Sequence, residues 1–438
     1  MEFKEKLISS YLAFEDGLDL TDTVHETRAR ALKVFEDKGY PTKKAELWKY
    51  TSFEALLREE SSLFPKSEVN IELKDVKKYF LYDTDTYKVI FIDGVYSPFL
   101  SNTTHDGLDV CLMSAALSKP KYRDLINTYF NKIAPSDESL TALNTSYAKE
   151  GAFVYIPKKT VAEKPIEIIH FSSGVQDSLW LQPRNLIVID KNSQVQIIER
   201  HQSLKEHAVV TNSVTEIYVH EEAFVDYYKL QNDLTTASLI DNTFIQQEKN
   251  SHASVHTFSL GGKLIRNNLR YLHKGKHILS TLKGLTILQG KQHVDHSTMV
   301  HHSQPNCESH QDYKGIFSER SEGVFNGQIL VDKIAQKTNA FQQNNNVLLD
   351  DKATVNSKPQ LEIFADDVKC SHGCTIGQMD EEALFYMRTR GIPKKEARAL
   401  MTYAFANNVL ESVQLPSLKK RINGQIAKKL GVNLGFEL

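Results

Sequence analysis

The chain has 438 residues, of which 41% are hydrophobic and 25% are charged, and its formal net charge is −2. These values are typical of a globular protein, and the length suggests two or three domains. The near-neutral charge gives no long-range attraction to nucleic acid or to an acidic membrane surface, and no apolar run approaches the roughly 20 residues of a membrane span.

The N-terminus and the cysteines indicate the cellular compartment. Residues 1–6 are mostly charged and lack an apolar segment, so we expect no signal peptide. The cysteines at positions 111, 307, 370 and 374 are too few and too scattered for a disulfide framework. We therefore predict a reducing, cytoplasmic location.

Residues 1–150 are predicted to form a mainly helical N-terminal region. Apolar side chains recur on one face over Glu26–Lys38, and Gly39 supplies a stop. The segment Pro41–Thr51 is dense in aromatic and charged residues and favours a packed turn between helices. Further elements expected here are a strand over Lys88–Asp93 and helices over Tyr122–Ile133 and Asp137–Tyr147.

Residues 151–370 are predicted to form the core of the fold, a right-handed parallel β-helix. Short β-rich runs alternate with turns, as where Leu186–Ile189 and Val195–Ile198 flank a turn at 190–193. We expect a period of about 20–25 residues and about nine or ten coils. A β-sandwich is the competing architecture. The solenoid is favoured because the region is too long for one sandwich and lacks helical crossovers.

A group of histidines lies late in this region. Read as metal ligands, its members would form a rich site, but their spacing matches no closed zinc site. The pattern therefore favours hydrogen bonding along stacked coils, or a subunit contact, over metal binding. The group comprises His293, His296, His301, His302, Cys307 and His310.

The segment Asp366–Gln378 joins the strand-rich region to the helices that follow. It places Cys370, His372 and Cys374 at every second position, so an extended backbone would direct all three side chains to one face. Thiolate and imidazole suit zinc or iron–sulfur species. Three donors on one strand cannot close a tetrahedral site alone, however, and a strand-end cysteine is often a small buried hydrophobe. Both interpretations stay open on spacing alone.

Residues 371–438 are predicted to form a C-terminal helical domain. Asp380 opens one helix, Pro393 begins a second and Pro416 a third. The second helix carries an apolar stripe with helical spacing. Such stripes usually pack in a core, and a partner surface is the alternative. The stripe is formed by Ala397, Leu400, Met401, Ala404 and Phe405.

Taken together, these residues resemble the SufD family of the Suf iron–sulfur cluster assembly system. The resemblance covers most of the chain in the right order, which makes it specific. The segments that carry it are Pro41–Thr51, His293–Phe317, Gly323–Gly327, Ala335–Thr338, Lys358–Ile363 and Asp366–Ile392. It implies a right-handed parallel β-helix between helical regions, and a non-catalytic scaffold that works with SufB and the ATPase SufC.

The resemblance also implies roles for particular residues. In the related SufB a scaffold cysteine occupies the position of Met387, so this chain is similar to SufD rather than to SufB. Cys370 and His372 become candidate ligands of a cluster shared at the SufB interface, whereas Cys374 stands where the family often has a small residue. Leu400, Met401, Ala404 and Phe405 become a candidate SufC contact.

The resemblance further implies that no cofactor is bound tightly in the isolated chain, that an iron–sulfur cluster forms transiently with SufB, and that the isolated chain is a possible homodimer. ATP hydrolysis is expected from SufC, because the stretch 284–292 echoes a phosphate loop but has five residues between its glycines where four are needed. The alternative function is a metal-dependent enzyme that uses a Cys/His site.

Overall fold

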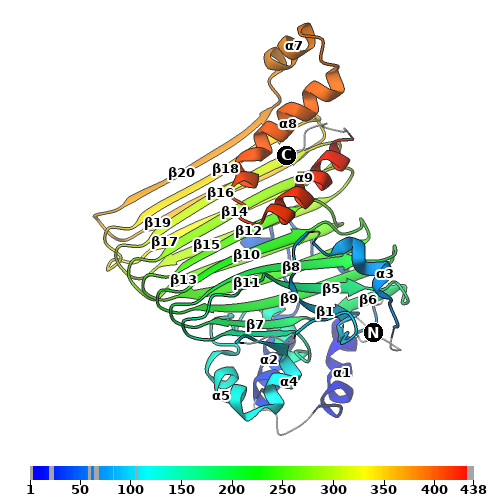
Figure 1. The fold of residues 1–438 in the computed structure, drawn as a ribbon, viewed down its shortest axis with the longest axis vertical. Coiled ribbons are helices and arrows are strands. Elements are labelled where there is room, and N and C mark those ends of the chain that lie inside the picture. The colour runs from blue at the N-terminus through cyan, green and yellow to red at the C-terminus, as the bar shows by residue number, and fades with distance from the viewer. Residues whose placement is uncertain are drawn as a thin grey trace.

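The computed structural model describes residues 3–18, 24–57, 61–63, 69–81, 83–103 and 107–431. Its centre is a parallel β-solenoid of about eight turns, built from two sheets whose strands stack coil upon coil (Figure 1). Helices precede and follow it. This arrangement confirms the predicted mainly β solenoid with helical regions on either side.

The first sheet contains one strand from each coil and ends at β20. Its strand order is β2-β1-β5-β8-β10-β12-β14-β16-β18-β20. Its first strands come from the part of the chain before residue 151. The bounds are β1 Tyr87–Ile92, β2 Val95–Tyr96, β5 Ile166–Ser172, β8 Gln194–Ser203, β10 Phe224–Gln231, β12 His252–Ser259, β14 Leu279–Leu288, β16 Glu308–Phe317, β18 Asn339–Leu348 and β20 Lys369–Gln378.

The second sheet supplies the opposite wall of the solenoid and ends at β19. Its order is β19-β17-β15-β13-β11-β9-β7-β4-β3, with β6 beside β9. The bounds are β3 Asp109–Leu112, β4 Ala152–Ile156, β6 Ser178–Leu181, β7 Arg184–Ile189, β9 Ala208–Val219, β11 Ala237–Gln247, β13 Leu264–His273, β15 His293–His302, β17 Glu322–Val331 and β19 Thr354–Ile363.

The coils are longer than the sequence pattern predicted. Leu264 pairs with His293, and His293 pairs with Glu322, so the repeat is 29 residues at this point. The expected period of 20–25 residues and the expected nine or ten coils were wrong. Most strands of the coils have about ten residues, and the short β-rich runs are only their most apolar portions.

The interior of the solenoid is filled by alternate side chains of both sheets. Near the N-terminal coils these are aliphatic, such as Ile168, Ile197 and Ile217, and all three are fully buried. Several strands, including β7, are buried on both faces because the helical regions cover their outer surfaces. The core is therefore both inside the coils and between the coils and the helices.

The N-terminal helices pack on the outside of the first coils. Trp48 in the Pro41–Thr51 segment is buried there, which fits the expected packed turn. The helical elements are α1 Phe3–Glu15, α2 His25–Lys38, η1 Glu46–Trp48, η2 Glu54–Leu56, α3 Leu73–Val76, η3 Lys77–Tyr79, α4 Met113–Ser118, α5 Pro120–Tyr129 and α6 Ser139–Ser146, where η marks a 3₁₀ turn.

The C-terminal helices are α7 Glu381–Thr389, α8 Lys394–Glu411 and α9 Pro416–Leu430. Helices α8 and α9 lie along the outer face of the first sheet, where Val409 and Leu418 pack against residues such as Phe258 (Figure 1). Helix α7 projects beyond this face, next to the end of β20. No helix within the described residues is long and apolar enough to cross a membrane.

Candidate functional site

The predicted Cys/His segment forms β20, the last strand of the first sheet. It pairs with β18 on one side and is the terminal strand of the sheet on the other. Such an edge presents unpaired backbone N–H and C=O groups, on which a further strand can pair. The segment therefore lies at the open end of the solenoid, as Figure 1 shows.

The three alternating side chains of β20 share the inner face of the solenoid. Cys370 is in register with Ala340, and His372 is in register with Gln342. Both partners are buried inside the preceding coil, so the residues above them extend the same interior columns. Cys374 follows by alternation. The prediction that all three leave one face of an extended segment is confirmed.

The donors on β20 differ in how far this chain covers them. Cys370 is half-buried against Val331 and Ala340, and burial raises the pKa of its thiol above the ordinary value. His372 and Cys374 are exposed, and neither makes a hydrogen bond to a described residue. Two thiols and an imidazole make a soft, incomplete donor set that a second protein surface could complete.

The two edges at this end of the solenoid differ in their capacity to pair. Strand β19 contains Pro359, which has no N–H to donate and blunts that edge. Strand β20 has no proline. Apolar side chains also remain exposed nearby, including Ile376 on β20 and Phe364 after β19, with exposed fractions of 45% and 63%. The β20 edge is therefore the one suited to a partner.

Helix α7 follows β20 after only two residues. Asp380 caps it, because its Oδ1 accepts hydrogen bonds from the backbone N–H groups of Glu382 and Ala383. Met387, the position where a cysteine would supply a thiolate, is half-buried on this helix. Phe385 and Tyr386 of the same helix are largely exposed.

The apolar stripe of α8 is only partly used by this chain. Ala397 is buried, but Ala404 is exposed, and Leu400, Met401 and Phe405 are half-buried. The residues that α8 packs onto the sheet lie mainly on another side of the helix and include Ala406, Val409 and Leu410. Most of the predicted stripe thus remains accessible.

The histidine group of β15 and β16 does not converge on one point. His296 and His302 are buried and hydrogen-bond to Thr286 and Ser309, at 2.9 Å in each case. His301 instead contacts Asp332 Oδ2 at 3.0 Å. These contacts support the interpretation as hydrogen-bonding side chains.

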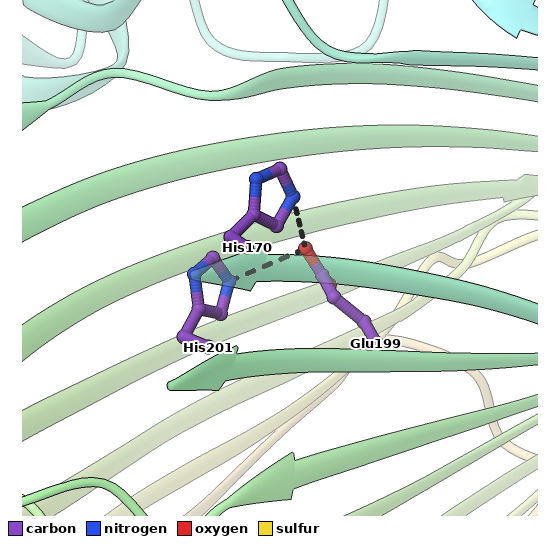
Figure 2. A group of neighbouring side chains, drawn as sticks. All are labelled: His170, Glu199 and His201. Atoms are coloured by element: carbon purple, nitrogen blue, oxygen red, sulfur yellow. Dashed lines mark ion pairs between the residues drawn. The ribbon is translucent and has the colours of Figure 1, made fainter. Parts of the chain in front are cut away.

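A different group of potential ligands escaped the sequence analysis. His170 on β5 and Glu199 and His201 on β8 are all buried, and their donor atoms lie within 4.8 Å of one another. Figure 2 shows one nitrogen of each imidazole facing the same oxygen of Glu199. Within the described residues, this is the only such group of three or more His, Cys, Asp or Glu side chains. The correct coil period would have aligned His170 with His201.

Comparison with known proteins gives a consistent result over nearly the whole chain. A family model described as "SUF system FeS cluster assembly, SufBD core domain" matches residues 171–405, and one for the SufBD protein N-terminal region matches residues 1–168.

The chain is 32% identical to an iron–sulfur cluster assembly SufBD family protein of Synechocystis sp., over 87% of this chain and 86% of that protein. It is 30% identical to the iron–sulfur cluster assembly protein SufD of Escherichia coli, over 90% of each chain. For SufD of Bacillus subtilis the identity is 25%, over 92% and 93%.

Proposed function

Because the chain belongs to the SufBD family of iron–sulfur cluster assembly proteins, we propose that it is the SufD-type, non-catalytic scaffold subunit of a complex with SufB and the ATPase SufC. In this role it supplies part of a cluster site and a surface for SufC. The cluster is the product under construction, and it forms transiently between chains.

One observation carries the proposal: a pairing-competent edge strand bears uncovered soft ligands. Strand β20 combines a free edge with Cys370 and His372 on its inner face. Addition of an edge strand from the solenoid of SufB would extend the sheet and bring the partner's ligands next to these two side chains. The blunted edge at Pro359 favours docking through β20.

The accessible stripe on α8 supports the second half of the proposal. Leu400, Met401, Ala404 and Phe405 form the contact for SufC on a helix that is anchored to the solenoid, since Lys314 Nζ donates a hydrogen bond to the Phe405 carbonyl at 3.0 Å. The same helix connects to β20 through α7. Movement of SufC during ATP hydrolysis would therefore act on the edge where the cluster ligands lie.

The experiment is reconstitution of the SufB–SufC–SufD complex with iron and sulfide. His372→Ala is expected to leave the complex assembled but to cut the visible absorption of the cluster heavily, because the variant removes an uncovered imidazole without disturbing a packed side chain. Ser371→Ala is the matched control, since Ser371 is exposed, adjacent, and directed to the opposite face of the same strand.

Two results decide the matter. A His372→Ala complex that assembles clusters at the wild-type level would remove the residue from the cluster site. Failure of the wild-type chain to co-purify with SufB and SufC from its own cell extract would contradict the scaffold role. The isolated chain is expected to lack acid-labile sulfide, because it holds only part of the ligand set.

A further inference from the structure

The interior of the first coils changes character at one level. Below it the inner columns are aliphatic, but at this level they carry His170, Glu199 and His201. Strands β1, β5 and β8 are adjacent and in register, so Phe91, His170 and His201 form one column across three coils. Glu199 precedes His201 by two positions and faces the same interior.

The rings in this column are stacked almost parallel. Phe91 and His170 have centroids 4.8 Å apart with an interplanar angle of 11°, and His170 and His201 are 4.8 Å apart at 9°. Stacking fixes the orientation of both imidazoles. Their Nε2 atoms lie 3.9 Å and 3.4 Å from Glu199 Oε1, as Figure 2 shows. Neither Nε2 atom has a hydrogen-bond partner among the described residues.

The carboxylate itself is held firmly in position. Asn185 Nδ2 donates to Glu199 Oε1 at 3.2 Å, and the Tyr227 hydroxyl donates to Oε2. Burial alone would raise the pKa of Glu199, but His201, Lys229 and His170 lower it well below its ordinary value. Glu199 is therefore ionised at neutral pH.

The nearest fixed cation is already paired. Lys229 Nζ contacts Asp241 Oδ1 at 2.5 Å and also the Thr243 hydroxyl. With one ammonium and two carboxylates, this part of the interior carries an excess negative charge. Burial lowers the pKa of His170 to about 3, so its imidazole is neutral and its ring nitrogen can act as a ligand.

A cavity of about 530 Å³ gives access to the group. His170 and Phe91 form part of its wall, together with the β1–β2 turn at Gly94 and the segment between β6 and β7. Glu150 and Gln182 also line it, and each has a buried polar atom, Oε2 and Nε2 respectively, without a partner among the described residues. An ion can thus reach His170 along a polar wall.

We propose that His170, Glu199 and His201 bind one divalent transition-metal ion inside the N-terminal coils of the solenoid. Two imidazole nitrogens and one carboxylate oxygen are the donor set of zinc and of non-haem ferrous sites, and they do not suit magnesium or calcium. Zinc is expected to bind more tightly than ferrous iron. A short convergence of the three donors is needed, because metal–ligand bonds are near 2.0–2.2 Å.

The site is distinct from the β20 edge and departs from the expectation that the isolated chain holds no tightly bound group. The ion would connect β5 to β8, which are neighbouring coils, and so stabilise the N-terminal end of the solenoid. Thermal stability is therefore a readout that is independent of cluster assembly.

The test uses the full chain with the exposed edge ligands removed by C370S, H372A and C374S, so that β20 cannot bind the added ion. After treatment with a chelator, this background chain is titrated with Zn²⁺ by calorimetry and with Co²⁺ by visible absorption. The expected result is about one ion per chain and a higher melting temperature, with no response to Mg²⁺.

Two substitutions in the background chain test the ligands. E199Q is nearly isosteric, and H170F retains a ring between Phe91 and His201 while removing the ligand nitrogen. Each should weaken binding at least about 10-fold, the lower limit for loss of even an outer-shell partner. H302Q is the matched control, since His302 is a buried imidazole that contacts His273 and Ser309 but no carboxylate.

The proposal is overturned if the background chain takes up well under one equivalent of Zn²⁺ and Co²⁺. This result needs no variant to fold. It is equally overturned if folded E199Q and H170F, checked by circular dichroism, bind and respond thermally as the background chain does. An effect of H302Q as large as that of E199Q would also contradict it.

Discussion

Glu216 on β9 is the buried attachment point of the loop between α5 and α6. Its Oε2 accepts hydrogen bonds from Arg184 Nη2 at 2.6 Å and from the backbone N–H of Asn131 at 2.7 Å. Its Oε1 accepts from the next three backbone N–H groups, at 3.0–3.2 Å. One carboxylate thus satisfies five donors, and the Glu216 side chain is fully buried.

We predict that Glu216→Gln lowers the free energy of unfolding by about 3–5 kcal/mol, the cost of leaving a buried charge without its counter-ion. The substitution keeps the shape of the side chain but replaces one acceptor by an NH₂ group. That group would face the Arg184 guanidinium and the Asn131 N–H, both of which are donors. Arg184 has an exposed fraction of 1%, so water cannot replace the lost acceptor.

The assay is urea unfolding followed by tryptophan fluorescence. The chain has two tryptophans, Trp48 and Trp180, and both lie in the apolar cluster between the N-terminal helices and the solenoid. The signal therefore reports on the region that Glu216 anchors.

Glu221→Gln is the control for the Glu216 prediction, because Glu221 contacts two lysines at 3.3 and 3.4 Å on the protein surface. Solvent-screened pairs of this kind contribute little, so the control should unfold as the wild type does. A loss below about 1 kcal/mol for Glu216→Gln would refute the reasoning.

Three further predictions follow from other parts of the molecule. Ala404→Arg on the exposed stripe should abolish SufC binding in a pull-down assay, whereas Gln414→Arg, outside the stripe, should not; equal binding by both would exclude the stripe. Burial lowers the pKa of His296 to about 3, so the unfolded chain takes up the proton first and stability falls as the pH drops below about 6.5. His296→Gln should reduce the slope of unfolding free energy against pH by up to about 1.4 kcal/mol per unit, and identical slopes would contradict this. Cys370→Ser should impair cluster reconstitution less than His372→Ala, because the thiol is half-buried and its pKa is raised, and a reversed order would assign Cys370 the larger role.

The sequence predicts the fold class well, because strand and helix periodicities are local properties. The coil length is a different matter. Corners of successive coils are marked by residues with φ between 56° and 60°, a left-handed conformation that asparagine tolerates but most residues avoid. Asn192, Asn250 and Asn306 occupy three of them, but Glu222 and His277 occupy the corners between. The asparagines alone show only every second coil, so the true period of about 29 residues was hidden.

The same error explains which site residues were found. Cys370 and His372 lie two positions apart on one strand, so alternation alone places them on one face. His170 and His201 are 31 positions apart and become neighbours only through the register of β5 and β8. With the correct period, the alternation of Glu199 and His201 would have pointed inward next to His170. A buried carboxylate between two imidazoles is costly unless it has a partner, and that is the physical reason to look for a cation there.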